Sequence, residues 1–362
     1  MAGLYLHIPF CACRCSYCDF YSTTRAHLRN DYTDALIREL ESRKTEISEP
    51  FQTIYFGGGT PSTLSIGQLE RIWEAVHRHL DMNSLQEATL EANPDDLNPD
   101  YLKGLKQLGF NRLSMGIQSF NDRYLQQMNR RHTAAEAIQA YDNARTAGFD
   151  NISIDLMYGL PQQTTDDWMQ TLEQAMRLQP EHCSAYHLSY EPGTRMYQSL
   201  ANAVSEETSL TLFQMLCDTL ADSGYKHYEI SNFALPGRHS RHNSLYWNGT
   251  AYLGLGPGAH SYDGHRLRSW NPGNLDAYLD GTLERDYEHL SEQDYTNELI
   301  MTRLRTSKGL DTAQIPVPFR TGFKQRLKTW LDNSCLEMEN DIVRLTKKGI
   351  FVSDSIFRDL FE

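Results

Sequence analysis

Four of the seven cysteines lie between Cys11 and Cys18, and three of them have a spacing suited to binding iron. Cys11, Cys15 and Cys18 form the pattern Cys-x-x-x-Cys-x-x-Cys directly after a short apolar run. Three thiolates on one short loop can bind three irons of a cubane cluster and leave the fourth iron free. A zinc site is one alternative, although zinc loops usually pair Cys-x-x-Cys units and need a fourth ligand. Unrelated reduced thiols are another, and the spacing of Cys13 makes it a bystander.

Polar residues that could hold a small molecule follow the later apolar runs. Gly57–Pro61 reads Gly-Gly-Gly-Thr-Pro, and glycines let backbone groups approach a ligand closely. Glu91 ends another of these runs, where a carboxylate can accept hydrogen bonds from ribose hydroxyls. Gln118 and Asp155 end two further runs. A plain turn or a surface carboxylate would explain one such motif, whereas their recurrence at strand ends favours a shared site.

A repeat of helix, glycine, aromatic residue and strand predicts how these residues are positioned. Gly109-Phe110 and Gly148-Phe149 each precede an apolar run, and Gly224-Tyr225 is a looser copy. Glycine just past a helix supplies a left-handed C-cap, and a unit of about 40 residues that ends in a strand is typical of βα repeats. The sequence therefore predicts an α/β fold with an open, partial (β/α)6 barrel. The six expected strands are residues 4–8, 53–56, 88–92, 112–117, 152–156 and 183–188.

Helix starts are also legible within these units. Ser65 and Gln68 form a capping box, and Asn98-Pro99 reads as an N-cap followed by the first helical residue.

The pattern changes after about Tyr190. A helix over 205–222 precedes a stretch rich in glycine, histidine and aromatic residues from His239 to Trp270. The last part is expected to be helical and to end in a β-hairpin wing with strands at 342–346 and 350–352. The predicted domains are the barrel with its following helix and strand (1–235), the Gly/His/aromatic-rich segment (236–285) and a small C-terminal, winged-helix-like domain (286–362).

Charge and cysteine content restrict the partners. Lys and Arg number 34 and Asp and Glu 47, which gives a formal net charge of −13 and disfavours nucleic acid as the main partner. The winged helix is therefore expected to have a structural or docking role. No apolar run is long enough to span a membrane, although peripheral membrane contact is compatible with the sequence. A strand starts at Leu4, so we expect no signal peptide, and unpaired cysteines suit the reducing cytoplasm.

The opening motifs resemble a known family. Tyr5-x-His7-Ile8-Pro9-Phe10-Cys11 and Tyr17-Cys18-Asp19-Phe20 are similar to the start of the coproporphyrinogen dehydrogenase and HemW group of radical SAM proteins. The resemblance runs along essentially the whole chain. It implies a [4Fe–4S] cluster on Cys11, Cys15 and Cys18, with S-adenosylmethionine (SAM) on its open iron. The residues implied to bind SAM are Tyr5, Tyr17, Gly58, Gly59, Thr60, Glu91, Gln118, Arg130 and Asp155.

The same resemblance gives these residues roles. The glycines would bind the methionyl amino group, Gln118 and Arg130 the ribose and carboxylate, and Tyr17 would lie beside the adenine. Arg131 is an alternative to Arg130 by register. Tyr186 and Leu188 are weaker candidates for the same pocket.

Two departures separate this chain from the coproporphyrinogen dehydrogenases. They carry a further cysteine where this chain has Phe20, and an N-terminal extension where three residues precede the first strand. His242-Asn243-Ser244-Leu245-Tyr246-Trp247 instead resembles the HNxxYW hexad of HemW-type haem chaperones. Imidazole is a common haem ligand, so His242 is the candidate, with His239 and His260 as secondary ones. A structural hydrogen-bonding role for His242 is the alternative.

The resemblance thus implies a haem chaperone with a radical SAM core, which takes haem to an unidentified acceptor protein and needs an electron donor. The alternatives are an oxygen-independent coproporphyrinogen III dehydrogenase and an iron–sulfur redox sensor. Whether the core cleaves SAM is left open by the sequence.

Overall fold

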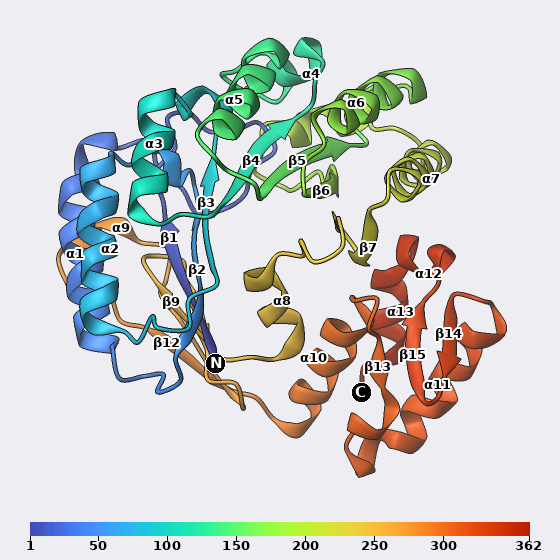
Figure 1. The fold of residues 1–362 in the computed structure, drawn as a ribbon. Helices are drawn as coiled ribbons and strands as arrows, with labels where there is room; N and C mark the ends of the chain where they lie inside the picture. Colours follow the sequence, from blue (N-terminus) through green and yellow to red (C-terminus); the bar gives the residue numbers. More distant parts are fainter.

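Six parallel strands form the central part of the molecule (Figure 1). A computed structural model describes every residue from Met1 to Glu362. Each neighbouring pair from the first strand to the sixth is parallel, so the carboxyl ends of all six meet at one edge. The expected partial (β/α)6 barrel is confirmed. The strands are β1 (Ala2–Ile8), β2 (Phe51–Gly58), β3 (Glu87–Ala92), β4 (Arg112–Gln118), β5 (Ile152–Tyr158) and β6 (His182–His187).

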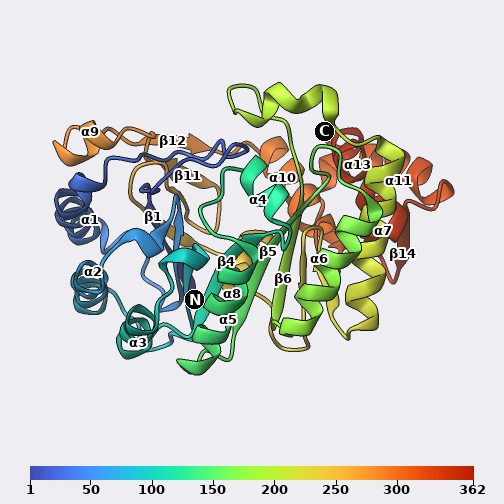
Figure 2. The same cartoon turned by 90° about the horizontal axis from the view of Figure 1, so that it is seen from above.

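Helices cover the convex side of this sheet, as Figure 2 shows from above. Ser65 and Gln68 form the predicted capping box, and the Asn98 side chain accepts from Tyr101 N–H. Gly109, with φ of 104°, caps the next helix in the left-handed conformation. The helices are α1 (Arg29–Arg43), α2 (Ile66–His79), α3 (Pro99–Leu108), α4 (Asp122–Gln127), α5 (Ala134–Thr146), α6 (Thr165–Leu178) and α7 (Glu206–Asp222). None of the helices is long and apolar enough to cross a bilayer.

Short strands extend the sheet beyond both edges of the six. β9 (Tyr252–Leu255) pairs in parallel with β1, and β8 (Asn232–Ala234) pairs antiparallel with β6. Residues 236–285, expected as a segment of their own, therefore contribute strands to the main sheet. The remaining outer strands are β7 (Lys226–Glu229), β10 (His260–Tyr262), β11 (Leu267–Trp270) and β12 (Asp286–His289), and the short turns of 3-10 helix are Ala26–Leu28, Pro61–Thr63, Pro94–Asp96, Met196–Asn202, Thr312–Gln314 and Val317–Phe319.

The helix α8 (Arg241–Asn248) lies on the concave side of the sheet, in the opening between its two edges (Figure 1). Its N-terminus is held by the buried carboxylate of Glu87 on β3, which accepts hydrogen bonds from Arg241 N–H (3.0 Å) and His242 N–H (2.9 Å). Arg303 donates to the carbonyls of Trp247 (2.7 Å) and Asn248 (2.8 Å) at the other end. Because a helix terminus leaves backbone groups without partners, these contacts fix α8 at both ends.

The C-terminal domain has its own apolar core and a small three-stranded sheet. Its hairpin joins β14 (Leu336–Glu339) to β15 (Ile342–Leu345), so the strand predicted at 342–346 is present. The strand predicted at 350–352 is wrong. The hydroxyl of Thr346 accepts from Gly349 N–H and starts a helix there. The other elements are α9 (Leu275–Leu279), which precedes the domain, and α10 (Glu292–Leu304), β13 (Leu310–Asp311), α11 (Arg320–Asp332), α12 (Lys347–Phe351) and α13 (Ser353–Leu360) within it.

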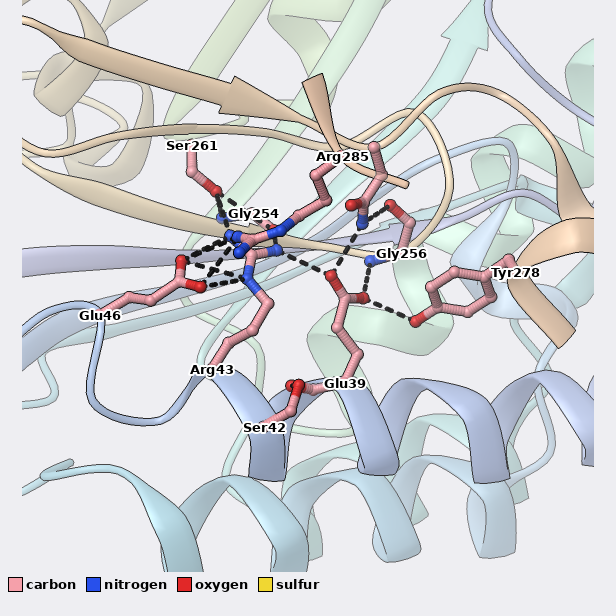
Figure 3. A network of polar contacts seen from close by, with 10 residues as sticks. Glu39, Ser42, Arg43, Glu46, Gly254, Gly256, Ser261, Tyr278 and Arg285 are labelled. Carbon is pink, nitrogen blue, oxygen red and sulfur yellow. Dashed lines mark hydrogen bonds and ion pairs between the residues drawn. The ribbon is translucent and has the colours of Figure 1, made fainter. Parts of the chain in front are cut away.

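A buried ion network fastens the loop between β9 and β10 to α1 (Figure 3). Arg43 donates to the carbonyl of Gly254 (2.8 Å) and to the hydroxyl of Ser261 (3.0 Å). Glu39 binds Arg43 at 2.7 Å and accepts a hydrogen bond from Gly256 N–H at 2.8 Å. The charges are satisfied by one another and by backbone groups, which is the condition for burying them. This network holds residues 254–261 in one position.

We expect Glu87→Gln to destabilise the protein by about 1–3 kcal/mol, because the amide can accept only one of the two α8 N–H groups and leaves the other buried without a partner. Urea unfolding followed by circular dichroism measures this change. Glu70→Gln, an exposed carboxylate on α2, is the matched control and should have no effect. Equal stability of Glu87→Gln and the wild type would show that the carboxylate does not anchor α8.

Candidate functional site

The carboxyl ends of the central strands surround a cavity of about 440 Å³. All of the predicted cluster and SAM residues except Tyr5 line it, and they come from the ends of the six strands and the loops that follow them. The histidines predicted for haem, His239, His242 and His260, do not line it. The predicted residues that line the cavity are Cys11, Cys15, Cys18, Tyr17, Gly58, Gly59, Thr60, Glu91, Gln118, Arg130 and Asp155, together with Tyr186 and Leu188.

The three thiols are half-buried, unbridged and contacted by hydrogen-bond donors. The Thr60 hydroxyl donates to Cys11 Sγ (3.4 Å), and Arg130 Nη1 donates to Cys15 Sγ (3.3 Å). Burial raises the pKa of the Cys11 and Cys18 thiols. The three thiols do not converge on a position for one metal ion. Cys13 also lines the cavity, but its thiol donates to the Asn129 carbonyl (3.7 Å).

Two half-buried carboxylates, Glu91 and Asp155, lie in the same cavity. Tyr55 Oη donates to Glu91 Oε1 (2.6 Å), and Gly58 N–H donates to Oε2 (3.2 Å). Burial raises the pKa of Glu91 to about 7 and the pKa of Asp155 to about 6. The Ser114 hydroxyl lies 3.4 Å from Asp155 Oδ1, and neither carboxylate has an ion-pair partner within 4 Å. Both are therefore ready to accept hydrogen bonds from a ligand.

Arg130 lies half-buried in the same cavity as these acids, whereas Arg131 is already paired. Arg131 forms ion pairs with Asp95 (2.5 Å) and Asp96 (2.9 Å). Arg130 binds the Gly116 carbonyl, but its Nε has no partner. A side chain at Gly116 would approach Arg130 Nη2 to 3.2 Å, so glycine gives the guanidinium its space. Arg130 rather than Arg131 is thus the arginine available to a ligand.

A second, larger cavity of about 720 Å³ lies between β1, α8, β9–β11 and α10. Phe20, whose side chain is 67% exposed, lines both cavities and forms part of the wall they share. Tyr5 faces this second cavity, and its hydroxyl lies 3.0 Å from His7 Nδ1. The aromatic lining residues are Tyr5, Phe20, Tyr21, Tyr246, Trp247, Tyr252, Tyr262 and Tyr295, and the polar ones include His7, His260, Arg268, Glu298 and Arg303.

Comparison with known proteins identifies the family. Residues 5–175 match the Radical SAM superfamily, and residues 290–352 match the HemN C-terminal domain. The heme chaperone HemW of Lactococcus lactis is 35% identical over 98% of this chain and 95% of its own length. HemW of Bacillus subtilis is 34% identical over 99% of this chain and 98% of its own. The chain belongs to the HemW family of heme chaperones, within the radical SAM superfamily.

A solved structure agrees with this assignment. HemN of Escherichia coli, a coproporphyrinogen III oxidase described as a radical SAM enzyme, superposes with a TM-score of 0.86 at 26% identity. The superposition covers 99% of this chain and 90% of HemN. The HemW-family chain therefore shares nearly its whole fold with HemN.

The HemW hexad places only its aromatic members in the second cavity. Tyr246 and Trp247 line it, whereas the His242 side chain is fully buried on the inner side of α8. His242 Nδ1 bonds to Thr53 Oγ1 (2.7 Å), and Nε2 bonds to Tyr246 Oη (2.8 Å). Burial lowers the pKa of this imidazole to about 3. The structure therefore does not bring His242 to a position where it could bind haem iron, because both ring nitrogens are taken.

Sequence reasoning missed the residues that hold this helix. Thr53 and Glu87 were not considered, although both occupy inward positions at the starts of their strands. The one sequence feature that could have pointed to Glu87 is a carboxylate at the first residue of an apolar strand. Its partner, the N-terminus of α8, is 154 residues away along the chain.

The Glu91 carboxyl gives a test by pH. Its pKa in the folded protein, about 7, lies above its value of about 4.3 in unfolded chains. The neutral form is therefore favoured by folding. This contribution to stability is fully present below about pH 4 and is lost as the pH rises through 7.

We expect the ligand-free wild type to lose stability between pH 5 and pH 8, and Glu91→Gln to lose less by on the order of 2 kcal/mol. Urea unfolding at each pH measures the difference. Glu70→Gln should keep the wild-type slope. An identical slope in wild type and Glu91→Gln would show that folding does not raise the pKa of Glu91.

Proposed function

We propose that this protein binds haem as cargo in the 720 Å³ cavity and passes it to an acceptor protein, beside a [4Fe–4S] cluster and SAM in the smaller cavity. The observation that carries the proposal is the aromatic cavity itself, which contains Tyr246 and Trp247 of the hexad and adjoins the cysteine-lined cavity at Phe20. The HemW relatives are named heme chaperones, and this activity fits a cavity that holds a flat apolar molecule.

The cysteine loop fits a cubane cluster better than a single ion. Cys11, Cys15 and Cys18 would each bind a different iron, so their thiols need not converge on one point. The donors Thr60 and Arg130 supply hydrogen bonds to sulfur, which tune such clusters. When bound, the cluster would supply an electron to SAM.

The remaining groups of the smaller cavity fit SAM. Glu91 and Asp155 would accept hydrogen bonds from its ribose hydroxyls, and the ionised carboxylates have the larger acceptor capacity. The unpartnered Nε of Arg130 would meet its carboxylate. Gly58 and Gly59 expose backbone beside them. Tyr17 and Gln118 complete the pocket, whereas Tyr5 faces the haem cavity and would contact SAM only at the shared wall.

The larger cavity fits a porphyrin in size and chemistry. Its volume lies within the range of about 300–1,000 Å³ that ligand cavities usually have. Aromatic rings give the flat apolar surface a macrocycle needs. Arg268 and Arg303 at the wall could receive the propionates. Arg268 is now paired with Glu298 (2.5 Å), so a propionate would compete with that carboxylate.

Coproporphyrinogen oxidation is the second candidate, and the superposition with HemN favours it. A porphyrinogen would fit the same cavity. Against it, Phe20 occupies the position where the dehydrogenases carry a further cysteine. A haem acceptor would be the partner of the carrier alone, whereas an electron donor would serve either function. Unpaired cysteines favour work in the reducing cytoplasm.

The first test concerns the cluster. Protein reconstituted without oxygen should contain about four irons, and Cys15→Ala should lose the cluster while Cys13→Ala keeps it. Iron and sulfide analysis with electron paramagnetic resonance (EPR) measures this. Loss of the cluster in Cys13→Ala and its retention in Cys11→Ala would contradict the ligand assignment.

The second test separates carrier from enzyme. The reconstituted wild type should bind haem in a defined complex and, given SAM and a reductant, form no protoporphyrinogen from coproporphyrinogen. Cys15→Ala should still bind haem, because the haem cavity is lined by other residues. Haem titration and product analysis by chromatography decide between the two. Turnover of coproporphyrinogen without a stable haem complex would favour the dehydrogenase.

A further inference from the structure

The haem cavity needs a group that can bind iron, and the structure restricts the choice among imidazoles. A histidine ligand needs one ring nitrogen free of other partners and facing the ligand. His242 does not line the cavity, and both its nitrogens are bonded. His7 lines the cavity, but Tyr5 Oη lies 3.0 Å from its Nδ1 and the Tyr21 carbonyl 3.1 Å from its Nε2. Neither ring has a free lone pair.

His260 differs from both. It is the first residue of β10 and lines the cavity. It is solvent-exposed, and its ring makes no hydrogen bond. The ring stacks on Trp270 with centroids 5.7 Å apart and an interplanar angle of 17°. Stacking holds the ring plane while both nitrogens stay free at the ring edge. Partial desolvation of the ring, followed by the charge of Arg268, lowers the pKa of His260 and so favours the neutral imidazole that a metal ligand requires.

The backbone of His260 is fixed as firmly as its ring. A side chain on Gly254 would come within 1.9 Å of the His260 carbonyl oxygen, so glycine lets the two strands touch. The neighbouring Ser261 hydroxyl is bonded to Arg43, and Gly256 N–H to Glu39 (Figure 3). A ligand held by a rigid backbone and a stacked ring is preorganised for a metal.

We propose that His260 is the axial ligand of the haem iron. One free imidazole nitrogen would bind the iron, and the aromatic wall that includes Tyr246 and Trp247 would contact the macrocycle. Arg268 on β11 pairs with Tyr262 on β10, two residues beyond His260. It lines the same cavity, where it would bind a propionate. The inference rests on the proposed function, since it assigns a ligand for the haem that the cavity is proposed to hold.

The test compares His260→Ala with His289→Ala, an exposed histidine on β12 that does not line the cavity. Haem titration gives the affinity, and absorption and EPR spectra report the axial ligand. His260→Ala should weaken haem binding roughly tenfold or more and change both spectra, and added imidazole should restore the wild-type spectra. His289→Ala should match the wild type. Wild-type spectra and affinity in His260→Ala would overturn the proposal.

A second variant separates the two histidines. His242→Gln can keep one hydrogen bond to Thr53 or Tyr246 and should retain the wild-type haem spectra even where its thermal stability falls. Loss of the imidazole spectra in folded His242→Gln but not in His260→Ala would assign the ligand to His242. Failure of the wild type to bind haem at all would instead refute the proposed function, so the two failures are distinguishable.

Discussion

The six central strands do not close into a complete barrel, so the concave side of the sheet has an opening that another part of the chain has to fill. The short helix α8 fills the opening, and it is held there by a buried carboxylate. Glu87 accepts hydrogen bonds from the first two N–H groups of α8, those of Arg241 and His242, and Thr53 bonds to the His242 side chain. The larger cavity depends on this anchor, because Tyr246 and Trp247 at the other end of α8 form part of its wall.

Two different parts of the chain build the two neighbouring cavities. The carboxyl ends of the strands bring the cysteines, the acids and Arg130 together, as parallel strands do in barrels. The strands added beside β1 and the helix α10 build the larger cavity next to them. Phe20, two residues beyond the third cysteine of the loop, is where the two meet.

The barrel and the strand-end positions of Glu91, Gln118 and Asp155 could be predicted from local pattern, and the family resemblance added the other predicted residues of the smaller cavity. A residue that ends a buried parallel strand must lie at the common edge, whatever the rest of the chain does. The exceptions required knowledge of distant partners. Tyr5 alternates toward the inside like the others, but β1 borders the opening, so it faces the second cavity. The apolar run at 350–352 resembles a strand in the sequence, but Thr346 caps the helix α12, which includes the start of this run.

The pair Glu87 and Glu91 shows why a site cannot be read from residue types alone. Both lie on β3, four residues apart and on the same face of a strand whose side chains alternate. Glu87 is satisfied by two backbone N–H groups from α8, and it serves the fold. Glu91 receives one tyrosine hydroxyl and one distant N–H, its pKa is raised to about 7, and it faces a cavity. The histidines divide in the same way, since His242 is satisfied and His260 is not. A buried or stacked polar group becomes a binding group when the fold leaves its hydrogen-bonding capacity unused, and that depends on partners far away in the sequence.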